Sequence, residues 1–152
     1  MPRHDPDRLL PSSYAHRVDM PTRFADLDEL GHINNLATAS ALEDGRTRFF
    51  MEWDIWLSPR DRPSSYSSFF ALVVASLNID FLSEAHYPEA LTVYNAITRI
   101  GSKSFSTRQL VTQADKPTAL CDAVFVHVQD GRSAVIPDDL RLALERASQS
   151  GL

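Results

Sequence analysis

The segment DLDELGHINN, residues 26–35, gathers the residue types from which a catalytic turn can be built. Two carboxylates, Asp26 and Asp28, precede a glycine, a histidine and two asparagines. An ordinary polar loop uses the same residue types, because Asp, Asn and Gly are common in turns. Here a helical pattern follows at once, and a helix N-terminus has free N–H groups that can bind a developing oxyanion. Gly31 also permits a positive φ or the close approach of a ligand. A carboxylate beside such a helix end suits acyl transfer, in which it attacks the carbonyl or activates water.

A long helix is predicted directly after this turn. From Asn35 to about Trp53, apolar residues recur every three to four positions. Asn34 or Asn35 can cap the helix, because the side-chain oxygen accepts from a free N–H of the first turn. Such a helix would be about 27 Å long at 1.5 Å per residue. Gly45 inside it costs about 1 kcal/mol against alanine, and a close packing partner is one reason to find it there.

Alternating patterns predict that most of the remaining chain is strand. One strand precedes the turn, weakened by a proline, and four follow the helix before a short C-terminal helix. The order predicts an α+β domain, with an antiparallel sheet of about five strands that wraps the long helix. Residues 1–13, with three prolines and mixed charge, are predicted to be a flexible arm before a single domain at 14–152. The predicted strands are 17–24, 69–81 (with one continuous apolar face), 90–100, 104–112 and 118–129, and the last helix starts at Pro137.

The composition excludes several classes of protein. A length of 152 residues predicts one domain, and a net charge of −5 argues against a general nucleic-acid surface. Cys121 is the single cysteine, so an intramolecular disulfide and a Cys-rich metal site are excluded, and the scattered histidines predict no metal site either. The N-terminus has no apolar signal region, and the longest apolar run is too short to cross a bilayer. We therefore expect a cytoplasmic protein that does not enter a membrane.

The stretch RFADLDELGHINNLATASALEDGR, residues 23–46, resembles the signature of hotdog-fold acyl-CoA thioesterases of the 4-hydroxybenzoyl-CoA thioesterase type. That signature runs Arg/Tyr-x-x-Asp-x-Asp-x-x-Gly-His-x-Asn-Asn, followed by Glu-x-x-Arg on a helix. IGSKSF at 100–105 and IPDDLRLALE at 136–145 are similar to the family's hairpin and tail, so the resemblance covers about residues 16–146. The residues that match the signature in register are Arg23, Asp26, Asp28, Gly31, His32, Asn34, Asn35, Glu43 and Arg46.

The resemblance implies hydrolysis of an acyl-CoA thioester to the free acid and CoA, with no cofactor beyond the CoA of the substrate. Asp28 would be the nucleophile or general base, and the backbone N–H of Asn35 would bind the oxyanion. Glu43 is a second catalytic carboxylate, a subunit contact, or half of an i, i+3 pair with Arg46 that stabilises the helix. The residues expected to shape the loop or bind substrate are Asp26, Gly31, His32, Asn34 and Thr38.

Two departures from the family bear on the substrate. Thr38 and Ala41 stand where the family helix usually has aromatic residues, so either a wider pocket or the loss of a hydroxyl contact to the substrate is expected. After the long strand, Glu84 and His86 replace the usual proline and basic residue. The hairpin at Ser102, Lys103 and Ser104 could bind the phosphates of CoA, although an ordinary solvated turn explains it as well.

Open sheet edges invite pairing, and the resemblance implies a homodimer or a dimer of dimers (a homotetramer), with active sites at the subunit boundary. Two other functions stay open. A non-catalytic acyl-CoA-binding protein would keep the fold and the pocket without activity. A hotdog hydratase or dehydratase would place a histidine five residues after an aspartate, typically with Asn-Pro between. Here His32 lies four residues after Asp28 and six after Asp26, without a proline.

Overall fold

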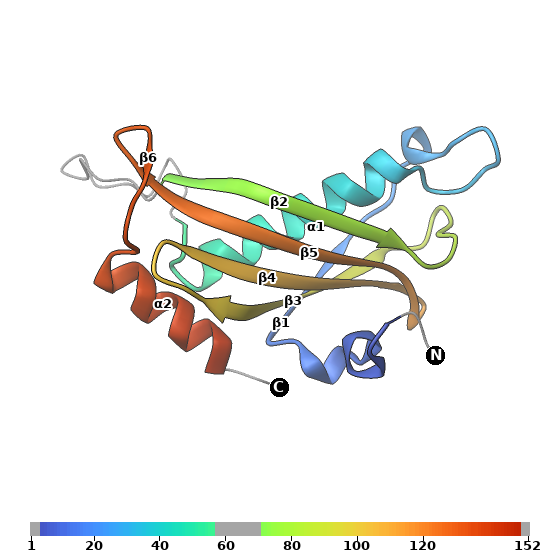
Figure 1. The fold of residues 1–152 in the computed structure, drawn as a ribbon. Coiled ribbons are helices and arrows are strands. Elements are labelled where there is room, and N and C mark those ends of the chain that lie inside the picture. Colours follow the sequence, from blue (N-terminus) through green and yellow to red (C-terminus); the bar gives the residue numbers. More distant parts are fainter. Residues whose placement is uncertain (1–3, 57–70, 150–152) are drawn as a thin grey trace.

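A curled antiparallel sheet holds one long helix in its concave face (Figure 1). The computed structural model describes residues 4–56 and 71–149. The strands lie in the order β1-β3-β4-β5-β2, and a short β6 pairs with β5. The expected fold class is therefore confirmed. The elements are β1 (His16–Met20), α1 (Asn35–Glu52), β2 (Ala71–Phe81), β3 (Leu91–Ile100), β4 (Ser104–Gln113), β5 (Lys116–Gln129), β6 (Arg132–Ser133) and α2 (Asp138–Gln149).

Helix α1 is fixed by a cap at its start and a close contact at its centre. The Asn34 side chain accepts a hydrogen bond from the N–H of Ala37 at 2.7 Å, which satisfies one free donor of the first turn. At Gly45 the helix approaches β3 so closely that an added Cβ would lie 2.8 Å from Cγ1 of Val93. The glycine is therefore needed for contact between helix and sheet, as the sequence suggested.

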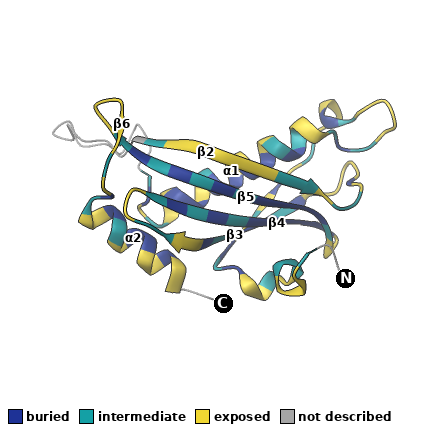
Figure 2. Ribbon diagram, in the orientation of Figure 1, coloured by how far each residue is buried: buried dark blue, intermediate teal, exposed yellow. Residues whose placement is uncertain are grey.

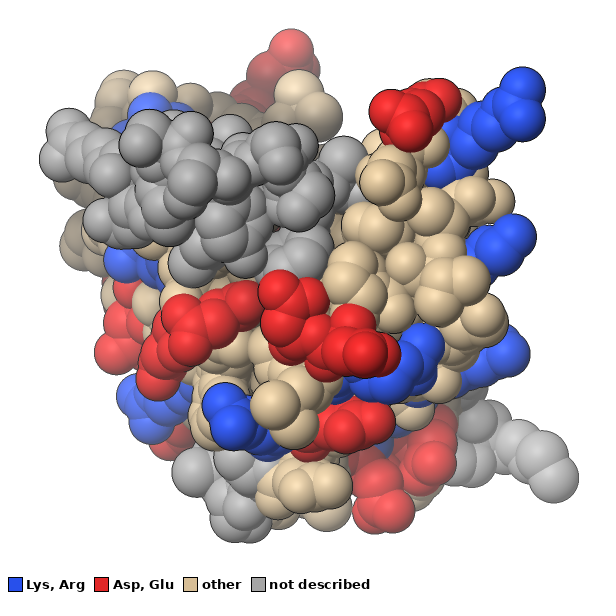
Figure 3. Space-filling model, turned by 90° about the vertical axis from the view of Figure 1, so that its left-hand side faces the viewer, with Lys and Arg blue, Asp and Glu red and all other residues tan. Residues whose placement is uncertain are grey.

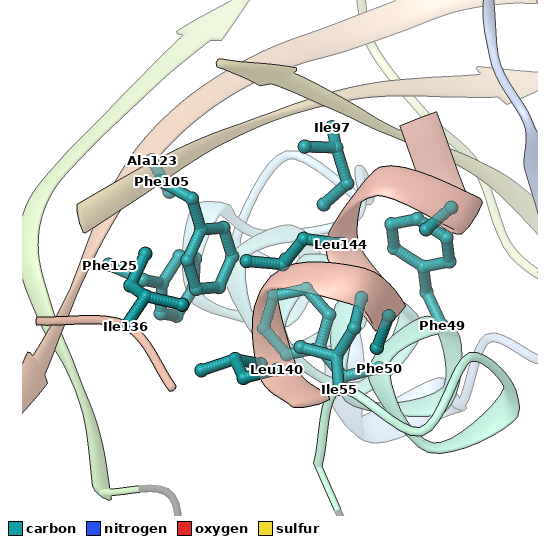
Figure 4. Packing of buried hydrophobic residues seen from close by; sticks show 12 residues of the cluster. Phe49, Phe50, Ile55, Ile97, Phe105, Ala123, Phe125, Ile136, Leu140 and Leu144 are labelled. Atoms are coloured by element: carbon teal, nitrogen blue, oxygen red, sulfur yellow. The ribbon is translucent and has the colours of Figure 1, made fainter. Parts of the chain in front are cut away.

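Two groups of apolar side chains fill the space between α1 and the sheet. Beneath the second half of α1, Phe49 and Phe50 pack with the stacked rings of Phe105 and Phe125 (Figure 4). Helix α2 closes this end of the core with side chains that include Leu144. A second group lies beneath the first half of α1, next to the loop that carries Asp28. Its fully or almost fully buried members include Leu42, Leu91, Val93, Val111, Ala119 and Cys121.

The N-terminal arm lies against the outer face of the sheet. Pro6–Leu9 and Pro11–Ser13 form two short 3-10 turns. The Tyr14 hydroxyl donates to the carbonyl of Arg8 at 2.7 Å, and the Arg8 guanidinium pairs with Asp122 of β5. These contacts place the arm, whereas the flexibility expected of it stays a prediction.

Three details differ from the sequence prediction. Strand β1 ends at Met20, because Pro21 cannot donate to the sheet, and Phe24–Asp26 is a 3-10 turn rather than strand. The continuous apolar face expected for β2 is broken by a bulge between Val74 and Ser76. The expected residues 69 and 70 lie outside the described part. Strand β6 was not predicted, since two residues carry too little pattern.

Strand β2 forms an exposed edge of the sheet (Figure 2). Val73 and Leu77 are 50% and 51% exposed, although the sequence pattern predicted that they belong to a continuous apolar face. Its neighbour β5, in contrast, carries several fully buried side chains. An apolar edge of this kind is a surface suited to pairing with another chain.

Candidate active site

The loop before α1 is folded around the carboxylate of Asp28. Its Oδ1 accepts hydrogen bonds from the backbone N–H groups of Leu30 at 2.9 Å and His32 at 3.0 Å. The N–H of Gly31 donates to the backbone carbonyl of Asp28 at 3.0 Å, and Gly31 has φ of 80°. Most other residues would be strained at that φ, so the glycine is required for the turn.

These hydrogen bonds favour the charged form of the Asp28 carboxylate. The N–H of His32, followed by that of Leu30, holds the pKa of Asp28 below its ordinary value, and the side chain is exposed to solvent. The carboxylate is therefore ionised at neutral pH. Its second oxygen, Oδ2, accepts no hydrogen bond from the described residues and is free to meet a substrate or a water molecule.

Asp26 holds the loop against the start of the helix. Its carboxylate accepts from the backbone N–H of Arg23 at 2.8 Å and from the Arg23 guanidinium, also at 2.8 Å. The side-chain hydrogen bond from Arg23 is the main reason that the pKa of Asp26 lies below its usual range. The backbone carbonyl of Asp26 accepts from the N–H of Asn34 at 2.8 Å. Asp26 and Asn34 thus each make hydrogen bonds within this segment, and their loop-shaping role stays a prediction.

The first residue of α1, Asn35, lines the same cavity as Asp28. Asn34 satisfies the N–H of Ala37, but those of Asn35 and Leu36 have no acceptor one turn back within the helix. Asp28, Asn35 and Thr38 together line a cavity of about 520 Å³. The structure therefore brings together a charged carboxylate and unpaired backbone donors, the two groups that acyl transfer requires.

The far wall of this cavity comes from the end of β2 and the loop after it. Glu84 lies 3.2 Å from Nε2 of His32, and the rings of His32 and His86 meet edge to face at 5.3 Å between centroids. Lys116 and Phe81 line the same wall. Sequence reasoning noted Glu84 and His86 but missed Lys116, whose position depends on the turn that pairs it with Gln113.

Glu43 and the hairpin lie away from Asp28 within one chain. Glu43 is exposed and lines a second cavity together with Arg46. The possible Glu43–Arg46 ion pair is not found among the described residues, since Arg46 instead donates to the side chain of Gln109 at 3.1 Å. The hairpin at residues 102–104 lies at the opposite end of the sheet from the loop that precedes α1 (Figure 1). Seen from that end, acidic side chains form a band across the surface with Lys and Arg around it (Figure 3).

Comparison with known proteins agrees with this geometry. Residues 22–144 match the family model of the thioesterase-like superfamily. The chain belongs to this superfamily. No curated protein matches it. The architecture is the hotdog fold expected from the sequence.

Solved structures of thioesterases share the fold. A thioesterase from Thermus thermophilus, complexed with coenzyme A and Zn, is 28% identical, with a TM-score of 0.74 over 90% of this chain and 96% of that one. A predicted thioesterase from Bacillus stearothermophilus is 27% identical, with a TM-score of 0.74 over 86% and 94%. A 1,4-dihydroxy-2-naphthoyl-CoA thioesterase from Synechocystis, at 20% identity and a TM-score of 0.70 over 84% and 93%, shows the same fold.

Two features are absent from the part of the chain that the structure describes. None of the helices in that part is long and apolar enough to span a membrane. Within residues 4–56 and 71–149, no group of three or more His, Cys, Asp and Glu side chains is arranged to hold a metal ion.

Proposed function

We propose that this protein hydrolyses acyl-CoA thioesters, with Asp28 as nucleophile or general base. The observation that carries the proposal is the shared cavity, which is lined by the ionised carboxylate of Asp28 and by Asn35, whose backbone N–H has no acceptor within the helix. Membership of the thioesterase-like superfamily supports the same reaction.

The reaction can follow two routes at this site. As general base, Asp28 takes a proton from water while the oxygen of that water bonds to the thioester carbonyl carbon. As nucleophile, Oδ2 itself attacks and forms a mixed anhydride, which water then cleaves. In both routes the carbonyl oxygen becomes negative and accepts from the N–H of Asn35, and the C–S bond breaks to release the CoA thiolate, which takes up a proton. His32 positions Asp28 through its backbone N–H.

Asp28→Asn tests this proposal directly. The amide keeps the shape of the side chain but can neither attack nor accept the proton of water. Release of free thiol from a panel of acyl-CoAs should fall at least about 100-fold, which is about 2.7 kcal/mol of barrier. Glu29→Gln is a matched control, since it removes the neighbouring carboxylate, which does not line the cavity.

Two results would favour the alternatives. If the wild type binds acyl-CoA but releases no thiol, the chain is a non-catalytic binding protein. If it instead adds water to an enoyl-CoA, it is a hydratase. Full activity of Asp28→Asn in a folded protein would rule out the assigned role.

We further propose that two copies pair along β2 into a double-width sheet. The edge is apolar, and β5 pairs with only one side of it. In such a dimer the hairpin of a second copy could approach the loop of Asp28, which is how Ser102, Lys103 and Ser104 would bind CoA. Within one chain, Lys116 is the lysine that lines the cavity and is placed to meet a phosphate.

A further inference from the structure

A second cavity runs between α1 and the edge strand β2. It has a volume of about 370 Å³. Most of its wall is apolar, with Leu42 from the helix and Val74, Leu77 and Ile79 from the strand. One buried cation, Arg46, also lines it. An apolar channel with a cation in its wall has the chemistry to hold an alkyl chain that ends in an anion.

The guanidinium of Arg46 makes few hydrogen bonds to the described residues around it. The side chain is only 6% exposed, and one of its five N–H donors is used, from Nη1 to Oε1 of Gln109 at 3.1 Å. The guanidinium also lies 5.1 Å from the ring centroid of Phe125. Among the described residues, no carboxylate lies within ion-pair distance of it. Burial lowers the pKa of Arg46, which is the sign of a charge taken out of water without full compensation.

The side chains next to Arg46 do not neutralise the charge of its guanidinium, so an anionic ligand could pair with it. Glu43 lines the same cavity, but its side chain is exposed to solvent, where water screens its field. Gln109 is itself engaged, since its amide donates to the carbonyl of Leu42 at 2.8 Å and to the side chain of Asn95 at 2.7 Å. Among the described residues, the buried guanidinium therefore has one amide oxygen as its hydrogen-bond acceptor and no carboxylate in contact with it.

This cavity continues the line of the Asp28 cavity along the helix. Thr38 in the first cavity and Leu42 in the second are one turn apart on α1. Phe81 and Ile79 are two residues apart on the same face of β2. From Asn35 to Arg46 the helix rises about 16 Å, and the arginine side chain leans back toward the helix start. An acyl group whose carbonyl lies at Asn35 would therefore point toward the guanidinium.

We propose that Arg46 is a specificity residue, which selects acyl groups whose far end carries a carboxylate. The substrate class would be mono-CoA thioesters of dicarboxylic acids, with the alkyl chain against Leu42, Leu77 and Ile79. A carboxylate can accept two parallel hydrogen bonds from the free edge of a guanidinium, an arrangement that a neutral chain end cannot provide. The inference rests on the proposed thioesterase function.

The test compares acyl-CoAs of equal length with and without a terminal carboxylate, from about 6 to about 12 carbons, lengths within the span of about 16 Å. The wild type should favour the carboxylate form in kcat/KM by at least about 10-fold at its best length, equal to about 1.4 kcal/mol. Arg46→Met should abolish that preference, so that the ratio of the two kcat/KM values in this variant falls to about 1. Methionine should fit, because apolar residues often replace buried charges without loss of stability.

Arg46→Lys and Arg48→Met complete the design. Lysine keeps the charge but not the planar fork, so part of the preference should remain. Arg48 is exposed and pairs with Asp44, so its replacement should leave the preference intact. If Arg46→Met does not fold, Arg46→Lys tests the proposal instead. A preference as strong in Arg46→Lys as in the wild type would mean that the planar guanidinium does not select the carboxylate.

A binding measurement separates the two proposals. Calorimetry on Asp28→Asn with the same acyl-CoA pairs reports selection without hydrolysis. If the wild-type protein hydrolyses none of the compounds, but the acyl-CoAs with a terminal carboxylate bind more tightly than those without, the thioesterase proposal fails and the Arg46 proposal stands. An equal response to both forms in wild type, in hydrolysis and binding alike, would overturn the Arg46 proposal. So would a preference unchanged in Arg46→Met, or one for hydroxyl-ended chains alone.

Discussion

At the scale of single residues, the charge state of Asp28 decides when the site can work. Backbone N–H groups hold its pKa below the ordinary 3.8, and the ionised form is the active one. Activity should therefore fall only as the pH drops through that lowered pKa, and Asp28 should impose no acid limb between about pH 5 and 8. A profile of kcat/KM from about pH 3.5 to 9, with circular dichroism to confirm folding, checks this. An acid limb within that range would mean that a group other than Asp28 acts as the base.

Thr38 is one of the cavity residues at which the chain departs from the family signature. It is 6% exposed and lines the wall next to Asn35. Thr38→Tyr should fill part of that space, so kcat/KM for long or bulky acyl groups should fall about 10-fold relative to short or slim ones. The measurement is the ratio of kcat/KM values over an acyl-CoA panel, with thermal unfolding as the check on folding. An unchanged substrate profile would show that this wall does not touch the acyl group.

At the scale of elements, the contact between α1 and β3 depends on the absence of one Cβ. Gly45→Ala should gain helix propensity of about 1 kcal/mol, but the new Cβ would meet Cγ1 of Val93 at 2.8 Å, and overpacking costs about 1–3 kcal/mol. A net loss of stability is therefore expected in urea unfolding. Val93→Ala removes the obstructing methyls, so the double variant should be less destabilised than the two single losses added together. Simple additivity would mean that the crowding is relieved elsewhere.

The elements also show why some features could be predicted and others not. Helix α1 was predicted to within a residue at its end, since periodicity and the Asn34 cap act locally. The Asp28 turn was visible for the same reason, because Asp28, Gly31 and His32 bond within five residues. The position of β2 at the sheet edge, Lys116 in the cavity and the bond from Arg46 to Gln109 depend on strand register. Register is set by packing between distant segments, which one sequence does not reveal.

At the scale of the whole molecule, the exposed β2 edge and the cavities beside it belong to the same surface. Leu77 and Val74 are about half exposed there, and Leu36 at the start of α1 is more exposed still. Contiguous apolar surface of this kind marks an interaction site. Because the two sides of a two-fold contact use the same patch, a second copy would cover β2 with its own β2 and enclose the cavity that holds Arg46. A monomer would leave the apolar wall of that cavity open to water.

Leu77→Lys tests this surface. A lysine in the middle of the edge would place a charge in the apolar contact, once in each copy, so the mutant should be a monomer where the wild type is a dimer or a dimer of dimers. Light scattering coupled to size exclusion measures the mass. Leu142→Lys on α2 is the matched control, since Leu142 is 48% exposed against 51% for Leu77. It should leave the mass unchanged. A wild-type monomer, or equal dissociation by both variants, would mean that this edge is not the interface, and the hairpin at residues 102–104 would then have no route to Asp28.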